Sequence, residues 1–263
     1  MAELTTRAFK NDEIKNFTSL LCDGYVIEGA RSMSAFLEAY RHTASAHADA
    51  RVLATLDGLD QAFYTSGHAI DKHRIDRTEG HDLQGLDAAA YEDGAHIGFL
   101  TTKSEFRIRR SNFLEKASAV SFADLAGKLM WHDDPDKPDF FALNTAPDDA
   151  LDPLMLLQVV PVTRAADALC AFPNGYFVGD LTPFENHALS RHLEDRYGYA
   201  LFGIGASYIG FQKTRPLTDE EGAALARDVC VLFSDALGDT FESRISRILA
   251  QQPWLLLNYA CGG

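Results

Sequence analysis

The chain has 263 residues, of which 46% are hydrophobic and 24% are charged, and its net charge is −14 with neutral histidines. This length and composition are ordinary for a folded globular protein and exclude a mainly disordered chain. No apolar run is long enough to cross a membrane, and residues 1–20 lack the pattern of a secretory signal. We therefore expect a soluble cytoplasmic protein of bacterial type that does not bind membranes.

The charge balance indicates which partners the protein attracts. The chain has 38 acidic residues against 24 Lys and Arg. Nucleic-acid binding is disfavoured, because affinity for a phosphate backbone comes from Lys and Arg. The densest basic segment, Arg107, Arg109 and Arg110, is typical of a solvated face. An acidic protein steers a basic one towards itself, so the partner we expect is a basic protein.

The N-terminal half predicts a mixture of short elements. Helices are expected over 12–22, over a segment capped by Ser32 or Ser34, and over 121–130, and strands over 25–27, 97–101, 106–108 and 140–143. Asp57-Gly58 stands between the apolar segments 52–56 and 62–64, which predicts a hairpin around a type I′ turn. Residues 66–94 are too polar to assign.

Proline marks a boundary along the chain. The first proline is Pro135, and three more follow up to Pro153, in a stretch that is also rich in aspartate. Proline restricts the backbone and clustered acids repel one another, so this stretch predicts an exposed linker. We expect two lobes: a mixed α+β lobe of unknown role over 1–150 and a second α+β domain over 151–263.

The C-terminal half has clearer signals. The apolar run Met155–Val162 predicts a buried strand. Thr182 and Thr218 each begin a capping box, which predicts two helices, and the first helix stops at Gly198. Further elements are expected as a short helix over 164–171, a strand over 176–178, two strands with a turn or bulge over 200–212, a helix over 241–249 and a strand over 254–257. The fold class is α+β, with a layered mixed or antiparallel sheet in this lobe and helices packed on one face.

This half resembles an uncharacterised bacterial domain family of unknown function over about Leu156–Tyr259. The matching residues are Pro161-Val162, Phe172-Pro173-Asn174-Gly175, Glu194-Asp195-Arg196-Tyr197-Gly198, Arg215-Pro216 and Leu225-Ala226. The chain departs from the family at Leu232-Phe233-Ser234-Asp235, where a Phe-Cys-Pro-Asp step is usual. It also ends its Trp254 segment on Asn258 instead of Asp. The resemblance implies the domain boundary and the fold, and no activity.

No metal or cofactor is expected. The histidine pairs 42/47, 68/73 and 187/192 have a spacing that points the two rings of a helical pair in different directions. A loop site of His68, His73 and His81 stays open. Gly203-Ile204-Gly205 lacks the third glycine of a dinucleotide fingerprint. The four cysteines form no C-x-x-C pair, so reduced thiols are expected, with Cys170 and Cys230 buried.

The segment after the predicted strand at 155–162 carries the candidate site. Its residues are Asn174, Tyr176, Asp180, His187 and Arg191. His187 and Arg191 share one face of the predicted helix, and helix N-termini attract anions, so this face is a candidate receptor for a carboxylate or phosphate.

Three functions remain open. The leading hypothesis is a non-catalytic partner-binding or accessory protein, and an immunity-type inhibitor of a basic partner is one form of it. The alternative is an enzyme or small-ligand-binding protein that uses the face around His187 and Arg191, with Asp180 as acid–base partner. The third hypothesis is a self-associating subunit. Whether the protein is an enzyme is left undecided.

Overall fold

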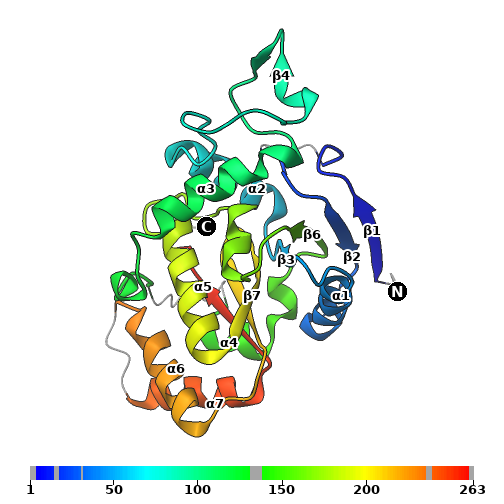
Figure 1. Ribbon diagram of the computed structural model, residues 1–263. Coiled ribbons are helices and arrows are strands. Elements are labelled where there is room, and N and C mark those ends of the chain that lie inside the picture. Colours follow the sequence, from blue (N-terminus) through cyan, green and yellow to red (C-terminus); the bar gives the residue numbers. More distant parts are fainter. Residues whose placement is uncertain (1–3, 15–17, 31, 131–137, 235–238, 261–263) are drawn as a thin grey trace.

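A mixed sheet organises the molecule. In the computed structural model the described residues are 4–14, 18–30, 32–130, 138–234 and 239–260. They form a seven-stranded sheet in the order β1-β2-β6-β3-β7-β8-β9, and a separate hairpin of β4 and β5 (Figure 1). The strands are β1 (Thr5–Phe9), β2 (Gly24–Glu28), β3 (Arg51–Ala54), β4 (Tyr91–Glu92), β5 (Ala95–His96), β6 (Leu154–Val160), β7 (Tyr199–Ile204), β8 (Tyr208–Lys213) and β9 (Trp254–Asn258). The neighbours β3 and β7 are parallel and the others are antiparallel, so the α+β class and the mixed sheet are confirmed.

The sheet does not show the expected split into two lobes. β6 follows residue 150 in the chain, yet it lies between β2 and β3 and pairs with both. β3 in turn pairs with β7. Strands from both sides of residue 150 therefore alternate within one sheet.

Helices cover both faces of the sheet. They are α1 (Met33–Ala46), α2 (Leu59–Lys72), α3 (Phe106–Ala117), α4 (Phe140–Thr145), α5 (Pro183–Tyr197), α6 (Asp219–Val231) and α7 (Asp239–Gln251). Successive side chains of a strand point to opposite faces. On β6, Leu156 and Val160 belong to the core that contains α2, α3, α5, α6 and α7, whereas Met155 and Leu157 belong to the core with α1. Among these described helices, none is both long and apolar enough to cross a membrane.

The helix caps, the glycine stop and the bulge predicted in the C-terminal half are confirmed. The Thr182 side chain accepts a hydrogen bond from the Glu185 amide at the start of α5, and Thr218 does the same for the Glu221 amide at the start of α6. Gly198 ends α5 with a φ of 68°, a left-handed conformation that favours glycine. The bulge expected between residues 200 and 212 lies in the pairing of β7 with β8. The Ser32 cap of α1 and the strand around 25–27 are confirmed as well.

The predicted hairpin at Asp57-Gly58 is wrong. Gly58 is the N-cap of α2, with a φ of 53°, and the segment 62–64 is helical. The Asp57 carboxylate accepts hydrogen bonds from the amides of Ser207 at 2.9 Å and Tyr208 at 3.1 Å. The conformation at Asp57-Gly58 is therefore set by a contact with the turn between β7 and β8. The local sequence does not predict this contact.

The strands predicted over 97–101 and 106–108 are also wrong, because residues 97–101 form no strand and α3 begins at Phe106. Buried polar groups decide this region. Glu105 accepts hydrogen bonds from the amides of Thr101 and Thr102 at 2.9 and 2.8 Å. Arg109 is 1% exposed and makes two 2.6 Å hydrogen bonds to Asp76, so this arginine does not belong to a solvated face.

The short helix expected over 164–171 is a 3₁₀ helix over Ala166–Cys170. Four other local predictions are corrected. The described part of 12–22 is not helical, and the helix at 121–130 shrinks to a 3₁₀ helix over Phe122–Leu125. Residues 176–178 form no strand, and 140–143 belong to α4, where the Asp139 carboxylate accepts the Ala142 amide at 2.7 Å. Part of the expected linker is thus buried structure, while residues 131–137 lie outside the described residues.

Candidate functional site

The structure places the predicted site residues in two groups. Asn174 is fully buried and ties its loop to α2. Its side-chain oxygen accepts the Thr65 hydroxyl at 2.5 Å, and its amide nitrogen donates to the Ala62 carbonyl at 3.0 Å. Its own carbonyl accepts the Asn186 side chain at 3.1 Å. Its polar groups are therefore used to hold the loop.

Tyr176 and Asp180 lie on the same loop as Asn174. The Tyr176 ring stacks on His68 with 4.8 Å between ring centroids, and the Lys72 amine lies 5.4 Å from the Tyr176 ring centroid. Asp180 accepts the Phe177 amide at 2.9 Å and closes a turn. This loop contacts α2, so it is not brought together with Arg191 in a single hollow.

His187 and Arg191 share a face of α5, as expected, and line a shallow hollow of about 220 Å³. The His187 ring is buried, with Nε2 at 2.9 Å from Asp167 Oδ1. Burial alone would raise the pKa of Asp167, but the His187 hydrogen bond and charge outweigh it and lower that pKa. Arg191 is half exposed, and its guanidinium is 3.8 Å from Asp195. The hollow thus contains one exposed cation beside a carboxylate.

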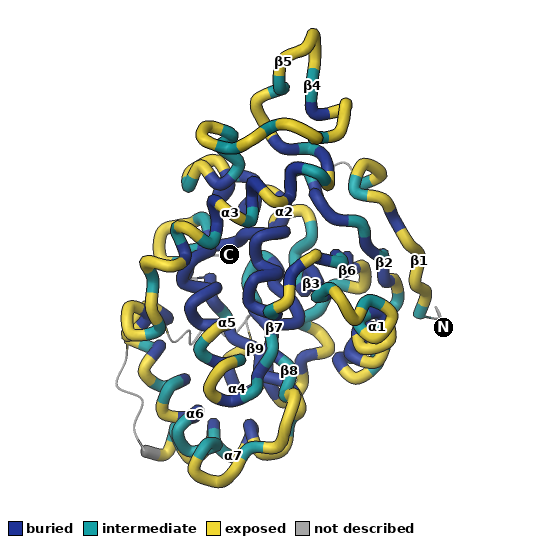
Figure 2. Tube along the Cα trace, in the orientation of Figure 1, coloured by how far each residue is buried: buried dark blue, intermediate teal, exposed yellow. Residues whose placement is uncertain are grey.

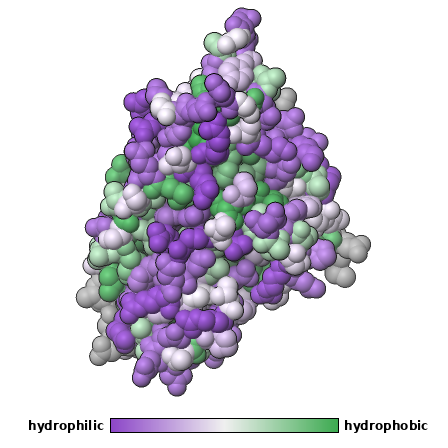
Figure 3. All heavy atoms as spheres, in the orientation of Figure 1, coloured by the Kyte–Doolittle hydropathy of each residue, from purple (hydrophilic) through white to green (hydrophobic). Residues whose placement is uncertain are grey.

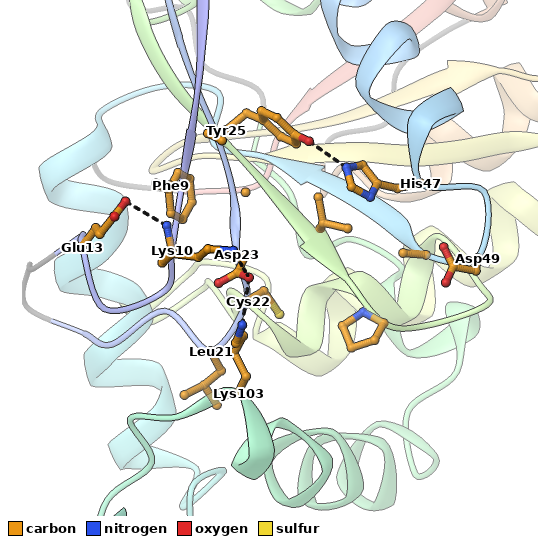
Figure 4. Close-up of a pocket in the computed structure, with 15 residues that line it drawn as sticks. Phe9, Lys10, Glu13, Leu21, Cys22, Asp23, Tyr25, His47, Asp49 and Lys103 are labelled. Carbon is orange, nitrogen blue, oxygen red and sulfur yellow. Dashed lines mark hydrogen bonds and ion pairs between the residues drawn. The ribbon is translucent and has the colours of Figure 1, made fainter. Parts of the chain in front are cut away.

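A larger pocket, which the sequence did not predict, lies at one end of the sheet. We call it the β1–β2 pocket; it has a volume of about 500 Å³, within the size range of ligand sites. Its walls come from the C-terminal ends of β1 and β6, the start of β2 and the loop after α1 (Figure 4). The lining residues are Ala8, Phe9, Lys10, Glu13, Leu21, Cys22, Asp23, Gly24, Tyr25, His47, Asp49, Ala50, Lys103, Val159 and Pro161.

Two polar groups project into this pocket from opposite sides. The Tyr25 hydroxyl lies 2.9 Å from His47 Nε2, so β2 and the end of α1 are joined across the pocket (Figure 4). Asp23 lies between two lysines, with its Oδ2 at 2.9 Å from the Lys103 amine and 3.5 Å from the Lys10 amine. Its burial acts to raise the pKa of Asp23, but the hydrogen bonds from Lys103 and the Asn11 amide lower that pKa overall. Asp23 is therefore ionised at neutral pH.

Cys22 is a candidate nucleophile only by its position. Its side chain is buried, and desolvation raises the pKa of the thiol to about 12. Since the thiolate is the reactive form, the protonated thiol of Cys22 lines the pocket without acting as a nucleophile at neutral pH. Cys170, also buried, has its pKa raised for the same reason.

A second hollow adjoins the first. We call it the α1 groove; it has a volume of about 710 Å³ and lies between β1 and α1. Its lining residues are Leu4, Thr6, Ala8, Tyr25, Ala35, Glu38, Ala39, His42, Thr43 and Ala46. Ala8 and Tyr25 line both hollows, so the pair Tyr25–His47 stands where the pocket and the groove meet.

The sequence held one signal for this site. Gly24 has no room for a side chain, because a Cβ atom would lie 2.0 Å from the Leu157 carbonyl oxygen and 2.9 Å from the Phe9 ring. That close approach allows the end of β1 to fold over β2. The expected helix over 12–22 concealed it, since this assignment replaced the loop that forms part of the pocket wall, and no strand was expected where β1 lies.

The motif of the domain resemblance has a structural role at the end of α5. The Glu194 carboxylate accepts the amides of Ala165 and Ala166, each at 3.3 Å. Asp228 of α6 accepts the Tyr197 hydroxyl at 2.5 Å and the Arg196 guanidinium at 3.1 Å. These contacts fasten α5 to its neighbours, and they support a fold motif more than a reactive site.

Comparison with known families agrees with this picture. Residues 156–257 match the model of a domain of unknown function, DUF4253. This match confirms the resemblance over the C-terminal part of the chain. The matched residues include most of β6 and β9 and all of β7, β8, α5, α6 and α7, whereas most of the β1–β2 pocket lies outside them. No curated protein and no solved structure matches the chain.

Proposed function

We propose that the protein is a non-catalytic binding protein that holds a basic segment of a partner protein in the α1 groove and the β1–β2 pocket. The observation that carries the proposal is the adjoining pair of hollows at the first two strands. The two hollows share Ala8 and Tyr25 and are lined by both apolar and polar side chains, so an extended segment can occupy both.

The charges of the two hollows select a basic segment. Four carboxylates line them, from Glu13, Asp23, Glu38 and Asp49, against two lysines. Both lysines are bound to Asp23, whereas Glu38 and Asp49 are exposed. The net charge of −14 adds long-range attraction, and hydrophilic residues cover most of the face drawn in Figure 3. An inhibitor that covers a basic partner is one form of this function.

Direct titration tests the proposal. The probe is a synthetic peptide of about eight residues that alternates lysine and valine. Calorimetry is expected to show micromolar binding that weakens about tenfold between ~50 and ~300 mM salt, because ions screen exposed charges. A peptide that alternates glutamate and valine is the matched control and is expected not to bind. Absence of binding by the lysine peptide would refute the proposal.

Charge substitutions locate the binding surface. Glu38→Gln and Asp49→Asn are each expected to weaken the lysine peptide about two- to fivefold, the scale of an exposed ion pair. Glu92→Gln changes the net charge equally but lies in the distant β4–β5 hairpin, and it is expected to leave binding unchanged. An equal loss in all three variants would mean that only the total charge matters and would exclude this groove.

A second candidate function rests on the hollow of α5. His187 and Arg191 both line it, which supports binding of a small carboxylate or phosphate there, as part of an enzyme or a ligand-binding protein. Titration with inorganic phosphate is expected to shift the NMR signals of the two side chains, and Arg191→Gln is expected to abolish the shift. If phosphate leaves the wild-type signals unmoved, this candidate falls.

A further inference from the structure

The two edge strands of the central sheet differ in how their backbone is covered. At β9 the side chain of Asn144, on α4, takes the place of a further strand. Its amide nitrogen donates to the Leu256 carbonyl at 2.9 Å, and its oxygen accepts the Leu256 amide at 2.7 Å. Asn144 is fully buried, so this end of the sheet is closed.

β1, at the other end, pairs only with β2 among the described strands. The first four of its five residues are exposed, and it forms the outer margin of the molecule (Figures 1 and 2). In an antiparallel pair, alternate residues direct both their N–H and C=O groups away from the neighbouring strand. The outer margin of β1 therefore presents backbone donors and acceptors to solvent, which is a template for an added strand.

The α1 groove lies beside this margin. Leu4, Thr6 and Ala8 alternate along the N-terminal segment and line the groove, so they share one face of the sheet. Alternate side chains of a strand added to β1 would point to that same face, towards Glu38 of α1. The backbone of β1 and the acidic groove thus select an extended segment with cationic side chains at every second position.

We propose that the basic segment of the partner binds by strand addition to the outer edge of β1, which pairs with no further strand among the described residues. This mode rests on the proposed function, because it uses the same groove and the same partner. Main-chain hydrogen bonds to β1 supply affinity, and the carboxylates of Glu38 and Asp49 select lysine or arginine side chains. A second copy of this chain has the same edge, but the net charge of −14 on each copy opposes that pairing.

Backbone methylation of the lysine–valine peptide tests the mode. One peptide carries N-methyl groups on its valines and a second carries them on its lysines. A strand bonds through one margin only, so one methylated peptide is expected to lose at least about tenfold in affinity and the other to change little. Amide exchange followed by NMR is expected to slow for alternate residues of β1 when the unmodified peptide binds.

The outcomes separate the mode from the function. Strand addition is wrong if the unmodified peptide binds and both methylated peptides bind equally well. It is also wrong if both methylated peptides bind more weakly while the β1 amides stay unprotected. In either case the acidic groove remains the binding surface. If the unmodified peptide does not bind, both proposals fall. A protein that is dimeric in solution, with the β1 amides already protected, would show that a second copy occupies the edge and would overturn the proposed mode.

Discussion

The two ends of the sheet show two ways of treating an exposed backbone. β9 is covered by Asn144, whose amide imitates a peptide group, and by α4, which carries it. β1 has no such cover among the described residues and instead adjoins an acidic groove. An uncovered edge strand risks unspecific pairing, so a protein that leaves one edge open next to a shaped groove has a place for a chosen partner.

The largest effect is expected when the closed edge is opened. Asn144→Ala removes the hydrogen bonds to Leu256 and leaves a buried amide without its acceptor. Loss of buried partners of this kind costs about 2–4 kcal/mol in total. Urea unfolding measures this loss, and Thr6→Ala on the exposed β1 is the control, with a change below about 0.5 kcal/mol. Equal losses at the two edges would contradict the comparison.

A pH effect of intermediate size is expected in the half of the sheet that ends in β9. Burial raises the pKa of Asp57 to about 7. Its pKa in the unfolded chain is near 3.8, so the folded protein binds more protons than the unfolded chain between these values. The contribution of Asp57 to stability is therefore greatest below about pH 4 and declines by about 2 kcal/mol or more as the pH rises to 7.

The variant Asp57→Asn isolates this contribution, because other groups titrate in the same range. The difference in the free energy of unfolding between the variant and the wild type is measured by urea unfolding at several pH values. As the pH rises, the variant is expected to become more stable relative to the wild type. A difference that is independent of pH between 4 and 7 would show that Asp57 is ionised in the folded state throughout.

The smallest effect is expected near the open edge. Tyr25→Phe removes the hydrogen bond to His47 between two half-buried side chains and is expected to cost less than about 1 kcal/mol. Tyr40→Phe is the matched control, because its buried hydroxyl donates to the Val52 carbonyl at 2.9 Å, and it is expected to cost about 1–2 kcal/mol. A larger loss at Tyr25 would mean that the pocket helps to hold the fold together.

The accuracy of the sequence predictions differs between the two halves for a physical reason. The capping boxes of α5 and α6 and the glycine stop at Gly198 act within one helical turn, so they can be recognised from a few neighbouring residues. The conformation of residues 105–117 depends on contacts outside the segment. Arg109 donates to Asp76, and Glu105 accepts the amide of Thr101. Glu105 and Arg109 are both buried, but nothing in the local sequence distinguishes buried polar side chains from solvated ones.

The candidate site shows the same limit more strongly. His187 and Arg191 could be placed on one helix face from their spacing, and in the structure both line one hollow. The β1–β2 pocket could not be found in this way, because Lys10, Asp23, His47 and Lys103 meet only when β1, β2 and α1 are packed. Gly24 is a residue whose type reflects that packing. The requirement for glycine follows from the positions of Phe9 and Leu157, which the sequence does not give.

The sequence by itself determined the α+β class, the acidic character, the strand at β6 and the capped helices α5 and α6, because composition, apolar runs and caps act over short distances. The tertiary structure alone decided that strands from both halves share one sheet, that Asn144 covers β9 and that, among the described strands, β1 pairs only with β2. Strand order depends on contacts between residues far apart in the chain, and the alternation of apolar side chains along each strand does not specify its neighbour.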